Sequence, residues 1–323
     1  MARLITHEQV KSLVSMSDAI ECMERAFREE GEGATLQPPR LNVKAGRGWL
    51  RIGPATLEKS GWMGFKAMNL VPGTGVRYQV HLYEIASGSL VAIMDAQHLT
   101  TLRTGATSAV ATRRLARSGA GTVALLGSGV EARAQLEAMQ VEGRVGSARV
   151  FSPTKANREQ LAVDFAQRYR MKIAPADSAE EAVSGADLIL AAVKSTEPVL
   201  FGRWLRAGTH INSVGTARRD QREIDQETFE RSARIIVDTK DGVFGEAGDA
   251  VAAQARIDAQ KVHELAKVVT GAAQGRESPE EITLFKSVGT GIQDIAVAAL
   301  IYQRAVERSV GVELGEFPYL KRN

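Results

Sequence analysis

Cysteine is nearly absent from this sequence, which has one, Cys22, in 323 residues. A single cysteine excludes an internal disulfide, and a long chain without disulfides is typical of a reducing compartment, so we expect a cytoplasmic protein. No uncharged apolar run approaches the roughly 20 residues needed to span a bilayer. The first 18 residues also lack the long apolar run of a signal peptide.

The chain also lacks a large excess of either sign of charge. The chain has 41 Lys and Arg against 38 Asp and Glu, a net charge of +3, and no basic block, which argues against a nucleic-acid partner. The mild excess of base suits an anionic cofactor and a carboxylate substrate. The five histidines share no metal-ligand spacing, so we expect no metal site. The composition, 44% hydrophobic and 24% charged, is that of a globular protein long enough for two domains.

The first third of the chain predicts a helix and then a sheet. Ser17-Asp18 opens a helical pattern that Gly31 ends. Residues 35 to 95 alternate strands and turns with no convincing helix between them, which predicts an antiparallel sheet. Its strands are expected at Gly61–Ala67, Tyr78–Ile85 and Leu90–Met94.

The middle of the chain has a different pattern. After a helix predicted over Leu99–Arg117, short apolar runs alternate with helical segments, which predicts a parallel, doubly wound sheet of the Rossmann type with helices on both faces. Ser178 with Glu181 predicts a capping box, and a last strand at Ile282–Ser287 precedes a helix from Gly291 to about Glu307. The strands of this region are expected at Thr122–Leu126, Ala148–Phe151, Lys172–Ala174, Asp187–Val193, His210–Val214 and Arg234–Val237, with helices at 130–140, 155–169 and 178–184.

A glycine loop follows the first of these strands. Gly127-Ser128-Gly129-Val130-Glu131-Ala132 has the pattern G-x-G-x-x-A between a strand and a helix. Gly127 permits a tight turn, Gly129 lets a pyrophosphate approach the backbone, and Ala132 allows close helix packing. The start of the helix then offers free N–H groups to the phosphates. The loop therefore predicts a dinucleotide site at Gly127, Ser128, Gly129 and Val130.

The end of the second strand indicates which dinucleotide binds. The segment Ser152-Pro153-Thr154-Lys155 lacks the acid that usually holds the ribose 2′-OH of NAD. The hydroxyls of Ser152 and Thr154, with Lys155 or Arg158, can instead hold a 2′-phosphate, which favours NADP(H) over NAD(H). The alternative is that Lys155 and Arg158 are solvated helix residues.

Six segments carry a resemblance to a known family, in family order along the chain: Gly64–Lys66, Gly88–Asp95, Leu99–Ala109, Gly127–Gly129, His210–Gly215 and Thr283–Gly289. With these segments the chain resembles the ornithine cyclodeaminase/mu-crystallin family. The resemblance implies a nicotinamide-dependent oxidoreductase with a Rossmann domain over 117–291. Residues 1–116 with 292–323 would form a second α+β domain that contacts the substrate and joins two subunits into a homodimer.

The resemblance also implies a substrate, an α-amino or α-imino acid whose carboxylate must be fixed by cations. Lys66 and Arg103 match the family pocket, and both are predicted to be catalytic as well as substrate-binding; Arg's planar fork suits a carboxylate. Arg40 and Arg77 are further substrate candidates. Asp294 matches a family acid, but a charge at a helix N-terminus explains it equally well. The predicted cofactor site is completed by Thr104, Val193, Val214, Val288 and Gly289.

One departure from the family pattern bears on the reaction. Cyclodeaminases carry an Asp two residues after the glycine that corresponds to Gly215, and this chain has Ala217, whose methyl group cannot act as a base. The segment is more similar to mu-crystallin and the ketimine reductases, which disfavours ornithine cyclodeamination.

Our main hypothesis is therefore NAD(P)H-dependent reduction of a cyclic ketimine carboxylate, such as 1-pyrroline-2-carboxylate or 1-piperideine-2-carboxylate, to the cyclic L-amino acid. Two alternatives stay open. One is dehydrogenation of an open-chain amino acid such as alanine or aspartate. The other is a non-catalytic binding protein regulated by NADP(H).

Overall fold

The computed structural model describes residues 2–315 and 317–318. The chain divides into two compact units: unit 1 runs to Arg103 and resumes at Thr290, and unit 2 is Thr104–Gly289. The first change of unit falls inside helix α3 (Gln97–Leu115), whereas the sequence suggested a change after residue 116. Helix α3 continues through the boundary between the two units, so the end of the helix does not mark that boundary.

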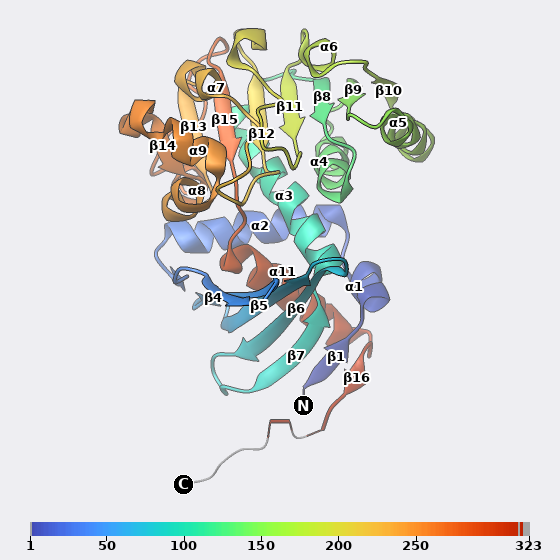
Figure 1. Ribbon diagram of the computed structural model, residues 1–323. Coiled ribbons are helices and arrows are strands. Elements are labelled where there is room, and N and C mark those ends of the chain that lie inside the picture. The colour runs from blue at the N-terminus through green and yellow to red at the C-terminus, as the bar shows by residue number, and fades with distance from the viewer. Residues whose placement is uncertain (1, 316, 319–323) are drawn as a thin grey trace. The chain divides into compact units, whose positions relative to one another are not determined.

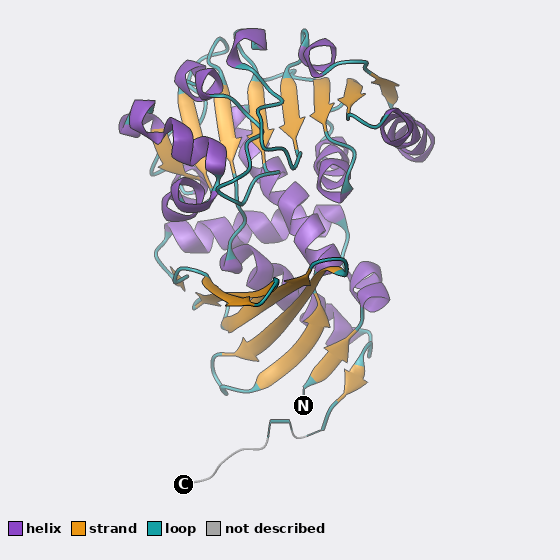
Figure 2. Cartoon of the chain, in the orientation of Figure 1, coloured by secondary structure: helices purple, strands orange, loops and turns teal. Residues whose placement is uncertain are grey.

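Unit 1 contains a mostly antiparallel sheet (Figures 1 and 2), as predicted for residues 35 to 95. Its order is β16-β1-β7-β6-β5-β4-β2, with β3 also paired to β4; β1 is parallel to β7 and the other pairs are antiparallel. The strands are β1 (Arg3–Ile5), β2 (Thr35–Leu36), β3 (Leu41–Ala45), β4 (Gly48–Leu57), β5 (Trp62–Val71), β6 (Gly75–Glu84), β7 (Leu90–Asp95) and β16 (Val312–Glu313).

One face of this sheet is covered by helix α11 (Gly291–Glu307), which packs against β4, β5 and β6 and against α2 (Met16–Gly31). Along β6, Val80 and Leu82 are buried, while the alternating residues His81 and Tyr83 are half-buried, because successive side chains point to opposite faces of a strand. The apolar core of unit 1 therefore lies between the sheet and α11. A short helix, α1 (His7–Leu13), precedes α2.

Unit 2 is the predicted doubly wound fold. Its eight parallel strands have the order β10-β9-β8-β11-β12-β15-β13-β14, with helices on both faces of the sheet (Figure 1). The order reverses between β8 and β11, and in such sheets ligands bind at the carboxyl ends of the strands beside the reversal. The strands are β8 (Thr122–Leu126), β9 (Ser147–Phe151), β10 (Lys172–Pro175), β11 (Leu188–Ala191), β12 (His210–Ser213), β13 (Arg234–Val237), β14 (Val262–Glu264) and β15 (Thr283–Lys286).

The central strands of unit 2 are buried on both faces, which is why they read as continuous apolar runs in the sequence. Val123 to Leu126 and Leu188 to Ala191 have no exposed surface. The helices are α4 (Val130–Val141), α5 (Lys155–Tyr169), α6 (Ala179–Val183), α7 (Gln226–Arg231), α8 (Lys240–Glu246), α9 (Gly248–Ala253) and α10 (Leu265–Val269), with short 3₁₀ turns η1 (Gly202–Trp204), η2 (Gln254–Arg256) and η3 (Ala259–Lys261).

Several local predictions need correction. Helix α2 begins two residues early, because Ser15 caps it in a capping box with Asp18. Ser178 caps α6, but Glu181 accepts its bond from the N–H of Asp177. The strands β1, β14 and β16 were not predicted, since two or three residues in a strand carry too little pattern, and the short helices α1 and α7 to α10 were not predicted either. Among the described residues, no helix combines the length and hydropathy needed to cross a membrane.

Candidate active site

Two predicted substrate residues meet in unit 1. Lys66 of β5 places Nζ 2.9 Å and 2.8 Å from the two carboxylate oxygens of Asp294. Arg103 of α3 donates from Nε to the same carboxylate at 3.0 Å. The three side chains are 5 to 7% exposed. We call Lys66, Arg103 and Asp294 the substrate cluster; it contains two cations and one carboxylate.

Small residues let the elements of the substrate cluster approach closely. A Cβ on Gly64 would lie 2.2 Å from the His81 carbonyl oxygen and 3.0 Å from Ile295 of α11. A Cβ on Gly291 would lie 2.8 Å from the carbonyl oxygen of Pro54 on β4. Thr290 caps α11 by accepting from the N–H of Gln293. These contacts fix the first turn of α11 against the sheet, and Asp294 lies in that turn.

Burial and charge act in opposite directions on the substrate cluster. Burial, with the charges of Arg103 and Arg40, lowers the pKa of Lys66 to about 8, although the charge and hydrogen bond of Asp294 oppose this. Burial alone would raise the pKa of Asp294, but the charges of Lys66 and Arg103 hold it below its usual range. A lysine with a pKa near 8 can both hold and release a proton near neutral pH.

Gln293 adds an unsatisfied donor beside the substrate cluster. Its Oε1 accepts from Arg103 at 3.1 Å, whereas its buried Nε2 has no hydrogen-bond partner in the described part of the chain. A buried donor without a partner is costly, so this N–H is suited to a ligand oxygen. Sequence reasoning left Gln293 and Asp294 out of the site, because a polar residue in the first turn of a helix has an ordinary local explanation.

The other predicted substrate residues differ in position. Arg40 acts electrostatically on both Lys66 and Asp294, and therefore adds to the positive charge of the substrate cluster. Arg77 is exposed and lies next to Tyr78, whose ring is 5.8 Å from Lys66 Nζ. Because neighbouring residues of a strand point to opposite faces, the structure does not bring Arg77 to the cluster.

The predicted glycine loop lies in unit 2, at the carboxyl end of β8. Gly127 has φ +111°, and a Cβ there would lie 2.6 Å from the carbonyl oxygen of Ala192. Gly129 is the N-cap of α4, and a Cβ there would meet no atom within 4 Å. Gly127 is thus required by the fold, while Gly129 leaves open space beside the helix N-terminus, which fits an approaching pyrophosphate.

The remaining predicted cofactor residues follow neighbouring strands. Val193 comes after β11, Val214 after β12, and Val288 and Gly289 after β15. The Asp238 carboxylate accepts from the N–H groups of Val288 and Gly289 at 3.1 and 2.6 Å, which fixes that turn. Thr104 is buried near the start of unit 2. All but Thr104 therefore lie at the edge of the sheet where a dinucleotide is expected.

The end of β9 is only partly available to a ribose phosphate. The Ser152 hydroxyl is bonded to Ser128 Oγ at 3.0 Å, and Arg158 is buried, donating to the Ser152 carbonyl and to Asp177. Lys155 is exposed, and among the described residues its side chain has only a 3.8 Å pair with Glu159. Lys155 is therefore the more available of the two predicted cations.

A second buried ionic group lies below this edge. Lys286 of β15 donates to Ser213 and Thr216 and pairs with Asp249 at 2.8 Å and Glu223 at 3.4 Å. We call Lys286, Glu223 and Asp249 the scaffold cluster. Glu223 also accepts from the N–H groups of Val193 and Gly215 at 3.1 and 2.9 Å. The scaffold cluster thereby holds the loops that follow β11 and β12.

Ala217 lies in the segment after β12, where cyclodeaminases have their Asp, and packs against the core of unit 2. Asp220 is exposed and pairs with Arg218 at 2.6 Å. Neither residue supplies a buried carboxylate base.

Comparison with known proteins gives a consistent result. The ornithine cyclodeaminase/mu-crystallin family model matches residues 2–309. The ketimine reductase mu-crystallin of Mus musculus is 34% identical over 284 residues, 85% of this chain and 87% of its own.

Two solved structures are similar over nearly the whole chain. One is Delta(1)-pyrroline-2-carboxylate reductase of Thermococcus litoralis in complex with NADH and L-proline, with a TM-score of 0.92, 36% identity and coverage of 97% of this chain and 100% of that one. The other is an archaeal alanine dehydrogenase dimer with bound NAD, with a TM-score of 0.92, 32% identity and coverage of 98% and 99%. This chain belongs to the ornithine cyclodeaminase/mu-crystallin family.

Proposed function

We propose that this protein reduces the C=N bond of a cyclic imino acid, such as 1-pyrroline-2-carboxylate or 1-piperideine-2-carboxylate, to the cyclic L-amino acid with NAD(P)H. The observation that carries the proposal is the uncompensated positive charge of the substrate cluster. Two buried cations share one carboxylate, and the charge of Arg40 also acts on that carboxylate. Buried charge is costly unless paired, so the cluster is suited to an anionic ligand.

The imino-acid carboxylate supplies that anion. Arg103 and the free Nε2 of Gln293 can bind it with directed hydrogen bonds, which fixes the orientation of the adjacent C=N carbon. A bound dinucleotide would supply the hydride for this reduction.

Lys66 is suited to handle the proton of the same reaction. Its lowered pKa of about 8 makes the ammonium a competent donor to the imine nitrogen. Asp294 contacts Nζ with both oxygens and so orients the lysine, and solvent restores the proton after turnover.

For the cofactor, we propose that NADPH is preferred to NADH. The relatives with bound cofactor carry NADH and NAD. In this chain the end of β9 has no acid to hold a 2′-OH, and Lys155 with Thr154 can contact a 2′-phosphate.

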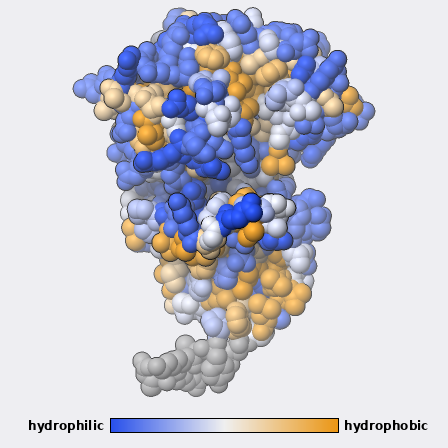
Figure 3. Space-filling model, viewed as in Figure 1, coloured by the Kyte–Doolittle hydropathy of each residue, from blue (hydrophilic) through white to orange (hydrophobic). Residues whose placement is uncertain are grey.

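We further propose that two copies associate through unit 1. The strands β3, β4 and β5 expose Leu41, Val43, Leu50 and Val71, and hydrophobic residues gather on the visible surface of this unit (Figure 3). Exposed apolar groups of this kind mark association surfaces. The archaeal alanine dehydrogenase of the same fold is a dimer.

The test is turnover of purified protein with NADPH or NADH, followed at 340 nm. We expect rapid oxidation with cyclic imino acids and slow oxidation with pyruvate or oxaloacetate plus ammonia. Faster turnover with an open-chain keto acid would instead assign an amino-acid dehydrogenase. Cofactor binding without turnover on any substrate would indicate a binding protein, and conversion of ornithine to proline would reinstate cyclodeamination.

A further inference from the structure

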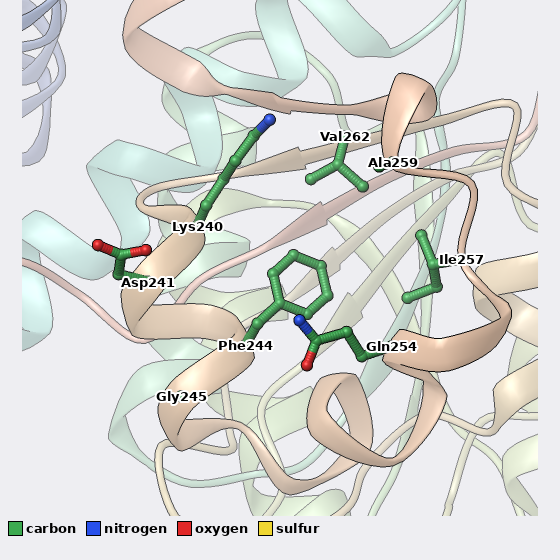
Figure 4. Close-up of a pocket in the computed structure, with 8 residues that line it drawn as sticks. All are labelled: Lys240, Asp241, Phe244, Gly245, Gln254, Ile257, Ala259 and Val262. Atoms are coloured by element: carbon green, nitrogen blue, oxygen red, sulfur yellow. The ribbon is translucent and has the colours of Figure 1, made fainter.

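A cavity of about 540 Å³ lies in unit 2 near the edge strand β14 (Figure 4). Its wall is formed by α8, by residues around the 3₁₀ turns η2 and η3, and by the first residue of β14. None of the residues assigned above to the dinucleotide or to the substrate cluster lines it. Its volume is within the range of small-molecule sites, which is about 300–1,000 Å³.

The lining combines an apolar surface with two unpaired polar groups. Phe244 and Ile257 are half-buried and point into the cavity with Val262 (Figure 4). Lys240 and Gln254 stand at its margin, and neither side chain has a hydrogen bond or an ion pair with the described residues. In Figure 4 the carboxylate of Asp241 points away from Phe244, and Lys240 and Gln254 stand on opposite sides of the Phe244 ring.

The charges around Lys240 also favour an anion. The charges of Lys240, Arg234 and Lys267 act together with burial to lower the pKa of His263, the second residue of β14. Of the neighbouring acids, Glu264 accepts the backbone N–H of Lys240, and Glu277 and Glu281 pair with Arg234. The ammonium of Lys240 is thus left for a ligand.

We propose that this cavity binds a small apolar carboxylate: a ring or branched chain over Phe244, Ile257 and Val262, with the carboxylate bonded to Lys240 at one end of the cavity. Ligand binding in this cavity does not depend on the proposed reductase activity.

The opposite side of α8 links the cavity to the cofactor edge. A Cβ on Gly242 would lie 2.6 Å from Thr239 Cγ2 and 3.1 Å from Val288 Cγ2, so this face packs tightly against the turn after β15. A ligand that presses on α8 changes the position of Val288, a predicted cofactor residue. The proposed site therefore alters dinucleotide affinity, and the effect is reciprocal.

The test uses 3-phenylpropionate and its neutral analogue 3-phenylpropanamide, titrated calorimetrically into the full-length protein. We expect Lys240→Gln to weaken phenylpropionate about fivefold and to leave the amide unchanged, because one exposed charge contact is lost. Ala259→Trp fills the cavity from an exposed position and should abolish binding of both compounds. Lys172→Gln, the same charge change on β10 at the other edge of the sheet, is the matched control.

A Lys66→Met variant separates this cavity from the substrate cluster. Phenylpropionate binding that survives Lys66→Met and is weakened by Lys240→Gln supports the proposal. Loss of binding in Lys66→Met with full retention in Lys240→Gln, or no binding to the wild-type protein at millimolar concentration, overturns it. The link to the cofactor is checked by the Kd of NADPH with and without saturating phenylpropanamide; an unchanged Kd overturns that part.

Discussion

The substrate cluster of unit 1 and the scaffold cluster of unit 2 are both buried groups of three charges built around a lysine, but their balance is opposite. The substrate cluster has two cations and one carboxylate. The scaffold cluster has one cation and two carboxylates. Lys286 and Glu223 have no exposed side-chain surface, whereas the residues of the substrate cluster are slightly exposed.

The two imbalances are resolved differently. In the scaffold cluster, backbone N–H groups and two hydroxyls bond to the excess carboxylate and to the lysine. Burial also raises the pKa of Glu223, although the charge of Lys286 opposes this. In the substrate cluster, two cations share one carboxylate, and the buried Nε2 of Gln293 has no hydrogen-bond partner among the described residues. A charge that the fold satisfies is structural, and one left unsatisfied marks a ligand site.

The largest expected effect is on the stability of unit 2. Lys286→Met leaves two carboxylates buried without their cation and should reduce the free energy of unfolding by about 3–5 kcal/mol. Urea denaturation measures the loss. The double variant Lys286→Met/Glu223→Gln should recover part of it, because one uncompensated charge is removed. A single variant within about 1 kcal/mol of wild type would contradict the structural role.

In the substrate cluster the same kind of change should affect turnover far more than folding. We expect Lys66→Met to lower kcat/KM for cyclic imines at least ~100-fold, a typical effect of removing a proton donor. The free energy of unfolding should change by no more than about 1 kcal/mol, because Asp294 keeps Arg103. Lys59→Met, at an exposed lysine of the same unit, is the control and should leave turnover unchanged. Loss of cofactor binding in Lys66→Met would contradict the assignment.

Stability and turnover should respond to rising pH in opposite directions. Lys66 has a pKa of about 8 in the folded protein and 10.5 in an unfolded chain. Between these values the unfolded state binds more protons, so the contribution of Lys66 to stability rises with pH from about 8 to 10.5. Turnover needs the protonated form, and kcat/KM should fall above about pH 8. Initial rates and urea midpoints across pH 6.5–10.5 check both trends.

Two variants identify the group whose deprotonation lowers kcat/KM above pH 8. Lys66→Arg should lower kcat/KM as Lys66→Met does, because a guanidinium keeps its proton, and the residual rate should not decline above pH 8. Asp294→Asn should move the decline to lower pH, because the carboxylate raises the pKa of Lys66. If kcat/KM still falls in the same way above pH 8 in Lys66→Arg, the titrating group is the substrate imine and not Lys66.

The smallest expected effect concerns cofactor choice. Lys155→Ala should reduce the ratio of kcat/KM for NADPH to that for NADH about fivefold, since an exposed charge contact contributes little. Lys194→Ala, another lysine of unit 2, is the comparison. An unchanged ratio would remove Lys155 from the 2′-phosphate site.

Much of unit 2 could be predicted because its strands and helices have clear local sequence patterns. Thr122–Leu126 is an apolar run with a glycine turn, and the structure has the same strand. The short strands β1, β14 and β16 were missed, because their pairing partners decide them and not their own pattern. The position of Arg77 away from Lys66 could not be predicted, since the face of a strand on which a residue lies depends on register.

The sequence by itself determined the alternation of strands and helices, the glycine loop, the absence of an acid at Ala217 and the family resemblance, because these depend on neighbouring residues. Only the tertiary structure decided that Asp294 joins Lys66 and Arg103 and that Lys286 is satisfied by Glu223 and Asp249. Asp294 is 228 residues from Lys66 along the chain. Charge balance in a buried cluster is a property of the packed elements, and no local pattern contains it.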